Sequence, residues 1–283
     1  MAGRRRPCIL LNMYLGIDVG ATKTLFAVFE ADGKLVFEHK IETPQDYPSF
    51  LTRVGKTVVS DLSQYKFVWA CCAVPGWIDF KDGIAVSFGN LPWQNIHIKK
   101  DLEELLPGVN ILIHNDAKLA GLSEALLVQE KYRKILYLTI STGIGGGVII
   151  DGIIDPEMAN FEPGQMLFDH AGQKQKWEAF ASGKALREKY GKLASEIQDP
   201  AVWQEYAKSL TLGFEELLAT IQPQAVIIGG GVGAHFEMFQ SYLETELKNI
   251  NNPMVPTPPL LKAQRPEEAV IYGCYDYIKQ NVQ

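Results

Sequence analysis

Short apolar runs bounded by polar or glycine-rich segments recur along the first half of the chain. Runs of this length with apolar residues throughout are typical of buried β-strands. Apolar residues at helical spacing instead predict helices over Tyr47–Gln64 and Leu102–Leu106, and Asp101 is the expected N-cap of the second. The predicted strands are Tyr14–Val19, Leu25–Glu30, Leu35–Lys40, Phe67–Val74 and Val109–His114.

The second half repeats this opening and then becomes helical. After a predicted helix of small residues, Ala117–Val128, two predicted strands, Lys134–Ile140 and Val148–Asp151, enclose a glycine loop, Ser141–Gly147. The other predicted elements are the helices Trp177–Tyr190, Val202–Ile221, His235–Asn249 and Pro266–Tyr277, the strand Ala225–Ile228 with its glycine loop Gly229–Gly233, and the surface connection Pro253–Pro259. A strand–loop–strand unit therefore opens each half, near residues 15–28 and 135–150, which predicts an α/β protein of two lobes.

The expected lobes meet at about residue 117. A chain of 283 residues is long enough for two lobes of roughly 130 residues each. The expected parts are a disordered tail over residues 1–12, an N-terminal α/β lobe over 13–117 with the C-terminal helix of about 266–281 packed back on it, and a C-terminal α/β lobe over 118–265.

Composition is that of an ordinary globular protein, with 47% hydrophobic and 21% charged residues. The net charge of −6 argues against a nucleic-acid partner, because phosphate backbones attract basic surfaces. No apolar run is long enough to span a membrane, and the short apolar part of residues 1–12 does not fit a signal peptide. The true start is left open between Met1 and Met13. The four cysteines lack C-x-x-C spacing, which predicts reduced thiols and a cytoplasmic location.

The turn between the first two predicted strands holds an acid, a glycine, hydroxyls and a lysine. Gly20 lets the backbone approach a ligand closely, and successive N–H groups in such a turn can form an anion nest. Thr22, Thr24 and Lys23 can donate hydrogen bonds to phosphate oxygens, and Asp18 can hold Mg²⁺ through water. The alternative is an exposed β-turn that is polar because it is solvated.

The glycine loop Ser141–Gly147 leads into a strand. A dinucleotide fingerprint must instead run from a strand into a helix, so the Rossmann interpretation is rejected. What remains is a second hairpin whose tip can wrap phosphates. A glycine-rich turn without a ligand is disfavoured, because each glycine costs folding entropy.

Two further predicted strand ends carry candidate groups. Gly229, Gly230 and Gly231 follow a strand and precede a helix, where a flat base could lie against the backbone; close strand–helix packing is the alternative. Asp116 could accept the proton of an attacking hydroxyl, and Asn115 could bind neighbouring hydroxyls. An Asx N-cap for the following helix is compatible with both roles.

Taken together these motifs resemble the ROK family, named for repressors, open reading frames and kinases. The resemblance implies the two-lobed actin-like ATPase (ribonuclease H-like) fold, with the active site in the cleft between the lobes. It covers nearly the whole chain from about Tyr14. The matching segments are Gly16–Lys23, Val74–Gly76, Asn90–Trp93, Asn115–Ala117, Ser141–Gly147 and Ile228–Val232.

The resemblance implies ATP-dependent phosphorylation of a glucose-like hexose at its 6-hydroxyl, with Asp116 as general base. It also implies Mg²⁺ near Asp18 and a homodimer. The implied sugar-binding residues are Gly76, Asn90, Asn115, Asp116, Glu162, Gln165 and Glu178. The implied ATP-binding residues are Asp18, Gly20, Thr22, Lys23, Thr142, Gly143, Gly229, Gly230 and Gly231.

The chain departs from the family pattern at the segment that binds zinc. The family's E-x-G-H motif is Glu162–Gln165 here, with glutamine in place of histidine, and its cysteine cluster is Ala171–Glu178, which has no cysteine. A structural zinc would lack ligands, so we expect no zinc site. His170 is interpreted as a surface or packing residue, and Trp177 and Phe180 are expected to hold the region by packing.

Three other functions stay open at this point. A repressor of the family would need a helix-turn-helix before the first strand, which the roughly dozen preceding residues do not supply. A non-catalytic sugar sensor is disfavoured by the phosphate loops and Asp116. A kinase for another sugar, such as N-acetylmannosamine or fructose, is compatible with all the motifs, and the donor is left open between ATP and polyphosphate.

Overall fold

The structure is a computed structural model that describes residues 12–250, 252–265 and 268–282. Most of the predicted tail, residues 1–11, and the predicted start of the last helix at Pro266 lie outside the described residues. The chain divides into two compact units. Unit 1 comprises the residues up to Asp116 together with those from Cys274 onward, and unit 2 comprises Ala117–Gly273.

Unit 1 contains a five-stranded sheet in the order β3-β2-β1-β4-β8. β1 is antiparallel to β2 and parallel to β4, which is in turn parallel to β8. The bounds are β1 Met13–Val19, β2 Lys23–Phe29, β3 Leu35–Glu42, β4 Phe67–Val74 and β8 Asn110–Asn115, so all five predicted strands of this half are confirmed within a few residues.

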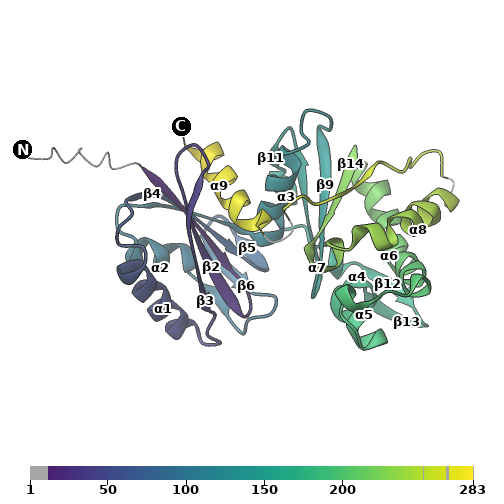
Figure 1. Ribbon diagram of the computed structural model, residues 1–283, viewed down its shortest axis with the longest axis horizontal. Helices are drawn as coiled ribbons and strands as arrows, with labels where there is room; N and C mark the ends of the chain where they lie inside the picture. The colour runs from purple at the N-terminus through teal and green to yellow at the C-terminus, as the bar shows by residue number, and fades with distance from the viewer. Residues whose placement is uncertain (1–11, 251, 266–267, 283) are drawn as a thin grey trace, which may run out of the picture. The chain divides into compact units, whose positions relative to one another are not determined.

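Alternate residues of these strands enter the core of unit 1. Leu15, Ile17 and Val19 are buried in one cluster with helices α1 (Tyr47–Ser60) and α2 (Ile98–Leu105), which Figure 1 shows beside the sheet. This alternation follows from the two-residue period of a strand.

The other face of the same sheet contacts the end of helix α9 (Ala269–Asn281). The ring of Tyr275 lies 5.3 Å from that of Phe29 and 6.1 Å from that of Tyr14, centroid to centroid. A second, small sheet of β5 (Trp77–Asp79), β6 (Ile84–Ser87) and β7 (Gln94–Ile96) completes unit 1. These three strands were not predicted from the sequence.

Unit 2 contains a second five-stranded sheet, in the order β11-β10-β9-β14-β15. β9 is antiparallel to β10 and parallel to β14, and β14 is parallel to β15. Strand order and direction therefore match those of the first sheet. The bounds are β9 Lys134–Ile140, β10 Ile144–Ile150, β11 Ile153–Ile154, β14 Ala225–Gly229 and β15 Leu260–Lys262.

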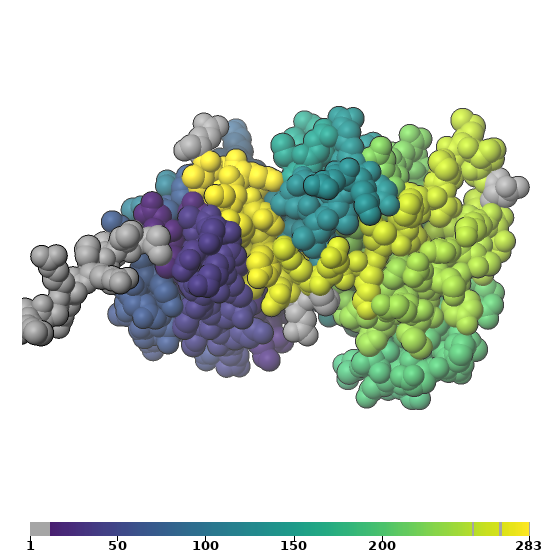
Figure 2. All heavy atoms as spheres, turned by 45° about the horizontal axis from the view of Figure 1, so that its top comes forward, coloured from purple at the N-terminus to yellow at the C-terminus, as the bar shows by residue number. Residues whose placement is uncertain are grey.

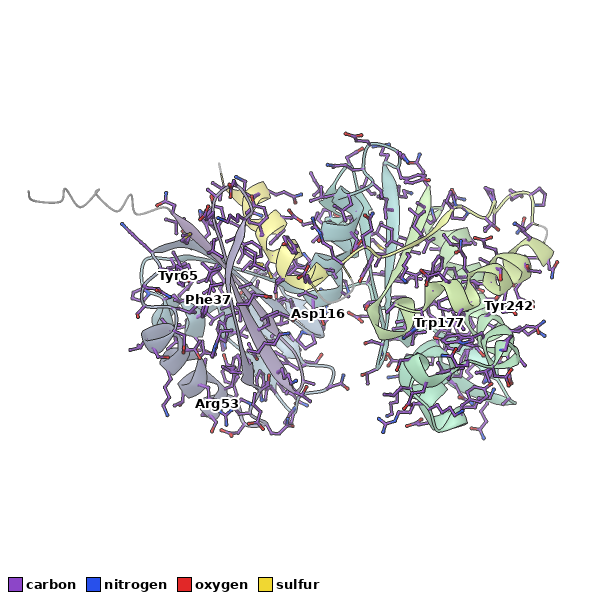
Figure 3. The ribbon with its side chains drawn as sticks, viewed as in Figure 1. Phe37, Arg53, Tyr65, Asp116, Trp177 and Tyr242 are labelled. Carbon is purple, nitrogen blue, oxygen red and sulfur yellow. The ribbon has the colours of Figure 1, made fainter. Side chains whose placement is uncertain are left out.

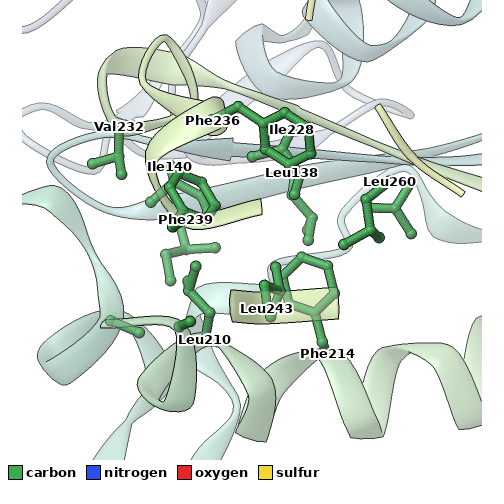
Figure 4. Close-up of a cluster of buried hydrophobic side chains, with 14 of the residues drawn as sticks. Leu138, Ile140, Leu210, Phe214, Ile228, Val232, Phe236, Phe239, Leu243 and Leu260 are labelled. Carbon is green, nitrogen blue, oxygen red and sulfur yellow. The ribbon is translucent and has the colours of Figure 1, made fainter. Parts of the chain in front are cut away.

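The two faces of β9 contact different helices. Leu136, Leu138 and Ile140 are buried in one cluster with residues of α6 (Pro200–Ile221) and α8 (Phe236–Asn249). Figure 4 shows part of this cluster, including Leu138 and Ile140. Ile135 and Tyr137, which alternate with them, belong to a second cluster with helix α3 (Asp116–Leu126). The remaining elements are the 3₁₀ turns η1 (Pro156–Met158), η2 (Pro163–Gln165) and η3 (Ala194–Glu196), the hairpin of β12 (Leu167–His170) and β13 (Gln173–Lys176), and the helices α4 (Trp177–Ala181), α5 (Gly183–Tyr190) and α7 (Gly230–Gly233).

Two local predictions are wrong. Helix α2 begins at Ile98 after the cap residue His97, so Asp101 is not the N-cap; its carboxylate instead accepts a 2.7 Å hydrogen bond from the Tyr47 hydroxyl. The predicted helix Trp177–Tyr190 is two helices, because Ser182 is extended and caps the second one.

The segment predicted as a surface connection, Pro253–Pro259, does lie on the outside of unit 2 (Figure 2), and most of its residues are exposed. Among the residues that the structure describes, no helix is both long enough and apolar enough to cross a bilayer.

Candidate active site

Polar groups of unit 1 gather at one edge of its sheet. Strands β1, β4 and β8 are parallel, so their carboxyl ends meet at the same edge. Asp18 pairs with Ala73 on β4, which pairs with His114 on β8, so the candidate residues that end these strands are level with one another. Ligands of α/β sheets bind at such an edge.

The turn after β1 is fixed by its backbone. The Gly20 amide donates to the Lys23 carbonyl over 3.0 Å, and a Cβ added at Gly20 would lie 2.8 Å from that oxygen. The Thr22 carbonyl accepts from the Thr43 amide at 3.0 Å. The side chains of Thr22 and Lys23 remain exposed, which suits donors to an anion. Thr24 was wrongly predicted as a third donor, because its side chain is buried and its hydroxyl lies 2.9 Å from that of Thr43.

Asn115 is tied to the loop that follows β4. Its amide Nδ2 donates to the Gly76 carbonyl over 2.9 Å. Gly76 has φ +106°, and a Cβ there would lie 2.1 Å from the Ser87 carbonyl, so only glycine fits. Asn90, the remaining candidate of this unit, is exposed on the loop between β6 and β7.

Two carboxylates share this edge. Asp116 is the first residue of α3 (Figure 3), where the helix dipole favours negative charge. Burial of Asp18, and then the charge of Asp116, raise the pKa of Asp18 to about 7, while Lys40 opposes the shift. Two oxygen donors whose charges repel each other are suited to a hard divalent cation.

The candidate phosphate-binding segments of unit 2 likewise share a sheet edge. β9 and β14 are parallel, and Thr139 pairs with Gly229, so the tip Ser141–Gly143 and helix α7 follow neighbouring strand ends. A cavity of about 960 Å³ lies beside them, lined by Thr142, Gly183, Lys184, Arg187, Gly231 and His235 among others.

Three of these lining residues, Lys184, Arg187 and His235, were missed from the sequence. Lys184 and Arg187 lie on α5, whose sequence is that of an ordinary polar helix, and only the fold brings them to the cavity. The third candidate loop is also different from the prediction, because Gly230–Gly233 is a short helix rather than a loop.

The second glycine loop is shorter than predicted. Only Ser141–Gly143 form the turn, since β10 begins at Ile144 and contains the other three glycines. Added Cβ atoms would lie 3.0 Å from the Ala117 side chain at Gly145, 2.8 Å from the Tyr137 carbonyl at Gly146 and 3.2 Å from Lys118 at Gly147. These glycines accommodate α3 and neighbouring backbone, which explains them without a phosphate.

The carboxylate of Glu178 lies against the turn Ser141–Gly143. A Cβ at Gly143 would be 2.7 Å from Glu178 Oε2, and the Ile144 amide donates to the same oxygen over 3.4 Å. Gln165 Nε2 donates to Glu178 Oε1 over 2.7 Å. A predicted phosphate-binding residue and two predicted sugar-binding residues are therefore in contact.

Glu162 has a partner that the sequence analysis missed. Lys118, on α3, places its ammonium 2.9 Å from Glu162 Oε1, and the Lys118 side chain is fully buried while that of Glu162 is 33% exposed. The same ammonium donates to the Phe161 carbonyl.

Packing, as expected, holds the segment that departs from the family's zinc motif. The imidazole of His170 stacks on Phe180 with ring centroids 4.0 Å apart. Trp177 is fully buried, and its indole N–H donates to the Ser209 carbonyl at 3.2 Å. Within the described ranges, no group of three or more His, Cys, Asp or Glu side chains is arranged to hold a metal ion.

Comparison with known proteins gives a family and relatives. The ROK family model matches residues 14–281. The Bacillus subtilis xylose repressor is 27% identical, over 88% of this chain and 73% of the repressor. The glucokinase of Streptomyces coelicolor is 21% identical, over 95% of this chain and 98% of that enzyme.

Solved structures give the same fold. A ROK family glucokinase from Streptomyces griseus, in complex with glucose and AMPPNP, superposes with a TM-score of 0.79. It is 21% identical, and the match covers 95% of this chain and all of that one. At this identity the likeness concerns the fold.

Proposed function

Because the chain belongs to the ROK family, we propose that it is an ATP-dependent sugar kinase that phosphorylates a glucose-like hexose at the 6-hydroxyl. Its α/β topology is that of the two-lobed actin-like ATPases, as the sequence predicts. The observation that carries the proposal is the edge of the unit 1 sheet, where Asp18, the Gly76–Asn115 contact and Asp116 lie together.

In the proposed reaction Asp116 accepts the proton of the 6-hydroxyl. As that oxygen forms a bond to the γ-phosphorus of ATP, the bond from the γ-phosphorus to the bridging oxygen breaks, and ADP leaves with the electron pair. A positioned general base contributes about 10²–10⁴ in rate. The contact between Asn115 and Gly76 would hold the strand end, and so the base, in place.

The phosphate chain is assigned to the two hairpin turns. Gly20, Thr22 and Lys23 of the first turn, and Thr142 and Gly143 of the second, offer backbone and side-chain donors to phosphate oxygens. Asp18 would hold Mg²⁺ through water, and this ion supplies charge neutralisation on the phosphates when bound. The charge of Asp116 beside Asp18 makes that edge favourable for a cation.

The base and ribose of ATP are assigned to the cavity beside α7. Gly229, Gly230 and Gly231 border it or precede it in the chain, and a Cβ at Gly231 would meet no atom within 4 Å. Open space over a glycine lets a flat base approach the backbone. Lys184 and Arg187 on the same cavity add positive charge for the phosphates.

The sugar is assigned to Gly76, Asn90 and Asn115 of unit 1 and to Glu162, Gln165 and Glu178 of unit 2. Ionised carboxylates only accept hydrogen bonds, so Glu162 and Glu178 favour substrates rich in hydroxyl donors and disfavour acidic sugars. The Gln165 amide fixes one Glu178 oxygen, which leaves the carboxylate in one orientation.

A coupled assay of ADP release with a panel of sugars tests the proposal. We expect turnover with glucose or a close relative, none with glucuronate, and none with 6-deoxyglucose, which should still compete with the substrate. Turnover with 6-deoxyglucose would rule out the 6-hydroxyl as acceptor.

Other outcomes identify the alternatives. Turnover restricted to N-acetylmannosamine or fructose would assign a different sugar, and replacing ATP by polyphosphate in the same assay decides the donor. Clear sugar binding without turnover of any sugar would favour a non-catalytic sensor and contradict the proposed function.

A further inference from the structure

A lysine is buried beside one of the proposed sugar-binding carboxylates. The Lys118 side chain is fully buried on α3, two residues after Asp116, yet its ammonium reaches Glu162 Oε1 at 2.9 Å. The same ammonium also donates to the Phe161 carbonyl, so it holds both the backbone and the side chain of this segment.

The neighbouring strand is shaped to admit this lysine. At Gly147 on β10 a Cβ would lie 3.2 Å from Lys118 Cα and 3.6 Å from its Cγ, so a larger side chain would press on the lysine stem. At Gly146 a Cβ would lie 3.1 Å from the ring of Pro163, which follows Glu162. Gly147 therefore makes room for the stem of Lys118, and Gly146 for the proline that follows Glu162.

Stability alone does not account for this arrangement. Taking an ammonium out of water is costly, and buried ion pairs are often no more stabilising than apolar residues of the same volume. The Glu162 side chain, in contrast, keeps a third of its surface exposed. The pair thus joins a fixed, buried end to an accessible end that can accept a hydrogen bond.

We propose that Lys118 is a positioning residue that orients Glu162 for the sugar and keeps it as an acceptor of hydroxyl hydrogen bonds. This inference rests on the proposed function. With one oxygen bound to the ammonium, the carboxylate cannot turn to serve a different substrate group, so Lys118 also sets which sugars fit.

The principal test is Lys118→Met, which keeps the length of the stem and removes the charge. We expect the KM for the sugar to rise roughly 10- to 100-fold, the range for losing a hydrogen bond to a charged group, while the KM for ATP stays within about twofold. Discrimination against deoxy analogues of the accepted sugar should weaken. Lys262→Met is the matched control, since it removes an exposed ion pair of similar length with Glu237 and should change neither KM.

A double-mutant cycle shows whether Lys118 acts through Glu162. In a Glu162→Gln background, Lys118→Met should add little, because no carboxylate remains to be oriented. The double variant has no unpaired charge at the site. Its comparison with Glu162→Gln therefore still tests the inference if Lys118→Met alone does not fold. Equal rises in both KM values, an unchanged sugar KM, or fully additive effects in the cycle would overturn the inference.

Failure of the proposed function would give a different pattern. If the wild-type protein binds sugar without turnover, the sugar Kd from calorimetry replaces KM and the same predictions hold for Lys118. If the wild-type protein binds no sugar at all, both the function and this inference are wrong.

Discussion

The two units share one sheet topology, but their candidate carboxylates have opposite kinds of neighbour. At the edge of the unit 1 sheet, burial of Asp18 and the charge of a second carboxylate, Asp116, raise the pKa of Asp18 to about 7. In unit 2, Glu162 is paired with a buried ammonium and Glu178 accepts from an amide. Under the proposed function, the repelling carboxylates of unit 1 suit a cation and a transferable proton, whereas the paired carboxylates of unit 2 suit the recognition of hydroxyl groups. One sheet topology would then carry a reactive edge (Asp18 and Asp116) in unit 1 and a recognition surface (Glu162 and Glu178) in unit 2.

The largest effect is expected from replacing the proposed general base, Asp116. Asp116→Asn should lower kcat by about 10²–10⁴, because the hydroxyl proton loses its acceptor, while sugar binding by calorimetry is retained. Asp151→Asn is the control, since this exposed carboxylate pairs with Arg133 in unit 2 and should leave kcat unchanged. Near-normal turnover of Asp116→Asn would show that Asp116 is not the general base.

The next prediction concerns the cost of burying the Asp18 carboxylate beside Asp116. The folded protein keeps the Asp18 proton between about pH 4 and 7, where the unfolded chain has lost it, so this group's contribution to stability falls as pH rises through that window. Asp18→Asn has no such charge. Its free energy of unfolding should exceed that of the wild type by on the order of 1–3 kcal/mol at pH 8, and by less at pH 5, although activity is lost. Chemical denaturation at the two pH values measures this, and a gain that is the same at both would contradict the raised pKa of Asp18.

A smaller effect is expected from replacing glycines of unit 2, which should fall into a class needed for packing and a class needed for ATP binding. Gly146→Ala should lower the free energy of unfolding by about 1–3 kcal/mol, since its Cβ would lie 2.8 Å from the Tyr137 carbonyl. Gly231→Ala has open space around its Cβ and should leave stability unchanged while raising the KM for ATP. Thermal melts and ATP kinetics on both variants decide it. If Gly146→Ala and Gly231→Ala melted at the same temperature, the steric explanation for Gly146 would be wrong, and the phosphate-binding role expected from the sequence would be favoured again.

Long strands were predictable from the sequence and short ones were not. The apolar runs of β1, β4 and β9 have enough residues for a pattern to emerge, and their predicted bounds are correct within one residue. β13, in contrast, is Gln173–Lys176, four polar residues with no apolar face. Its pairing with β12 depends on the turn between them and on tertiary context, neither of which a periodicity search detects.

The candidate site, too, was only partly predictable from the sequence. Motif residues such as Asp116 and Glu178 could be named from the resemblance, and their roles stay predictions. Lys118 was missed because a lysine on a helix is normally solvent-exposed, and only the fold shows that this one is buried. The glycines of β10 were misassigned for a related reason, since a sequence does not say which helix crosses a strand.

The smallest expected effect concerns metal in unit 2. Treatment with a zinc-selective chelator, followed by assay in excess Mg²⁺, should leave kcat and both KM values unchanged, because the side chains at the family's zinc segment have other partners. His170 stacks on Phe180, and Gln165 is bound to Glu178. Elemental analysis of the purified protein is the accompanying measurement, with less than stoichiometric zinc expected. Stoichiometric zinc, together with activity that the chelator removes and added Zn²⁺ restores, would show that sugar recognition in unit 2 depends on a metal. That result would contradict recognition by the paired carboxylates alone.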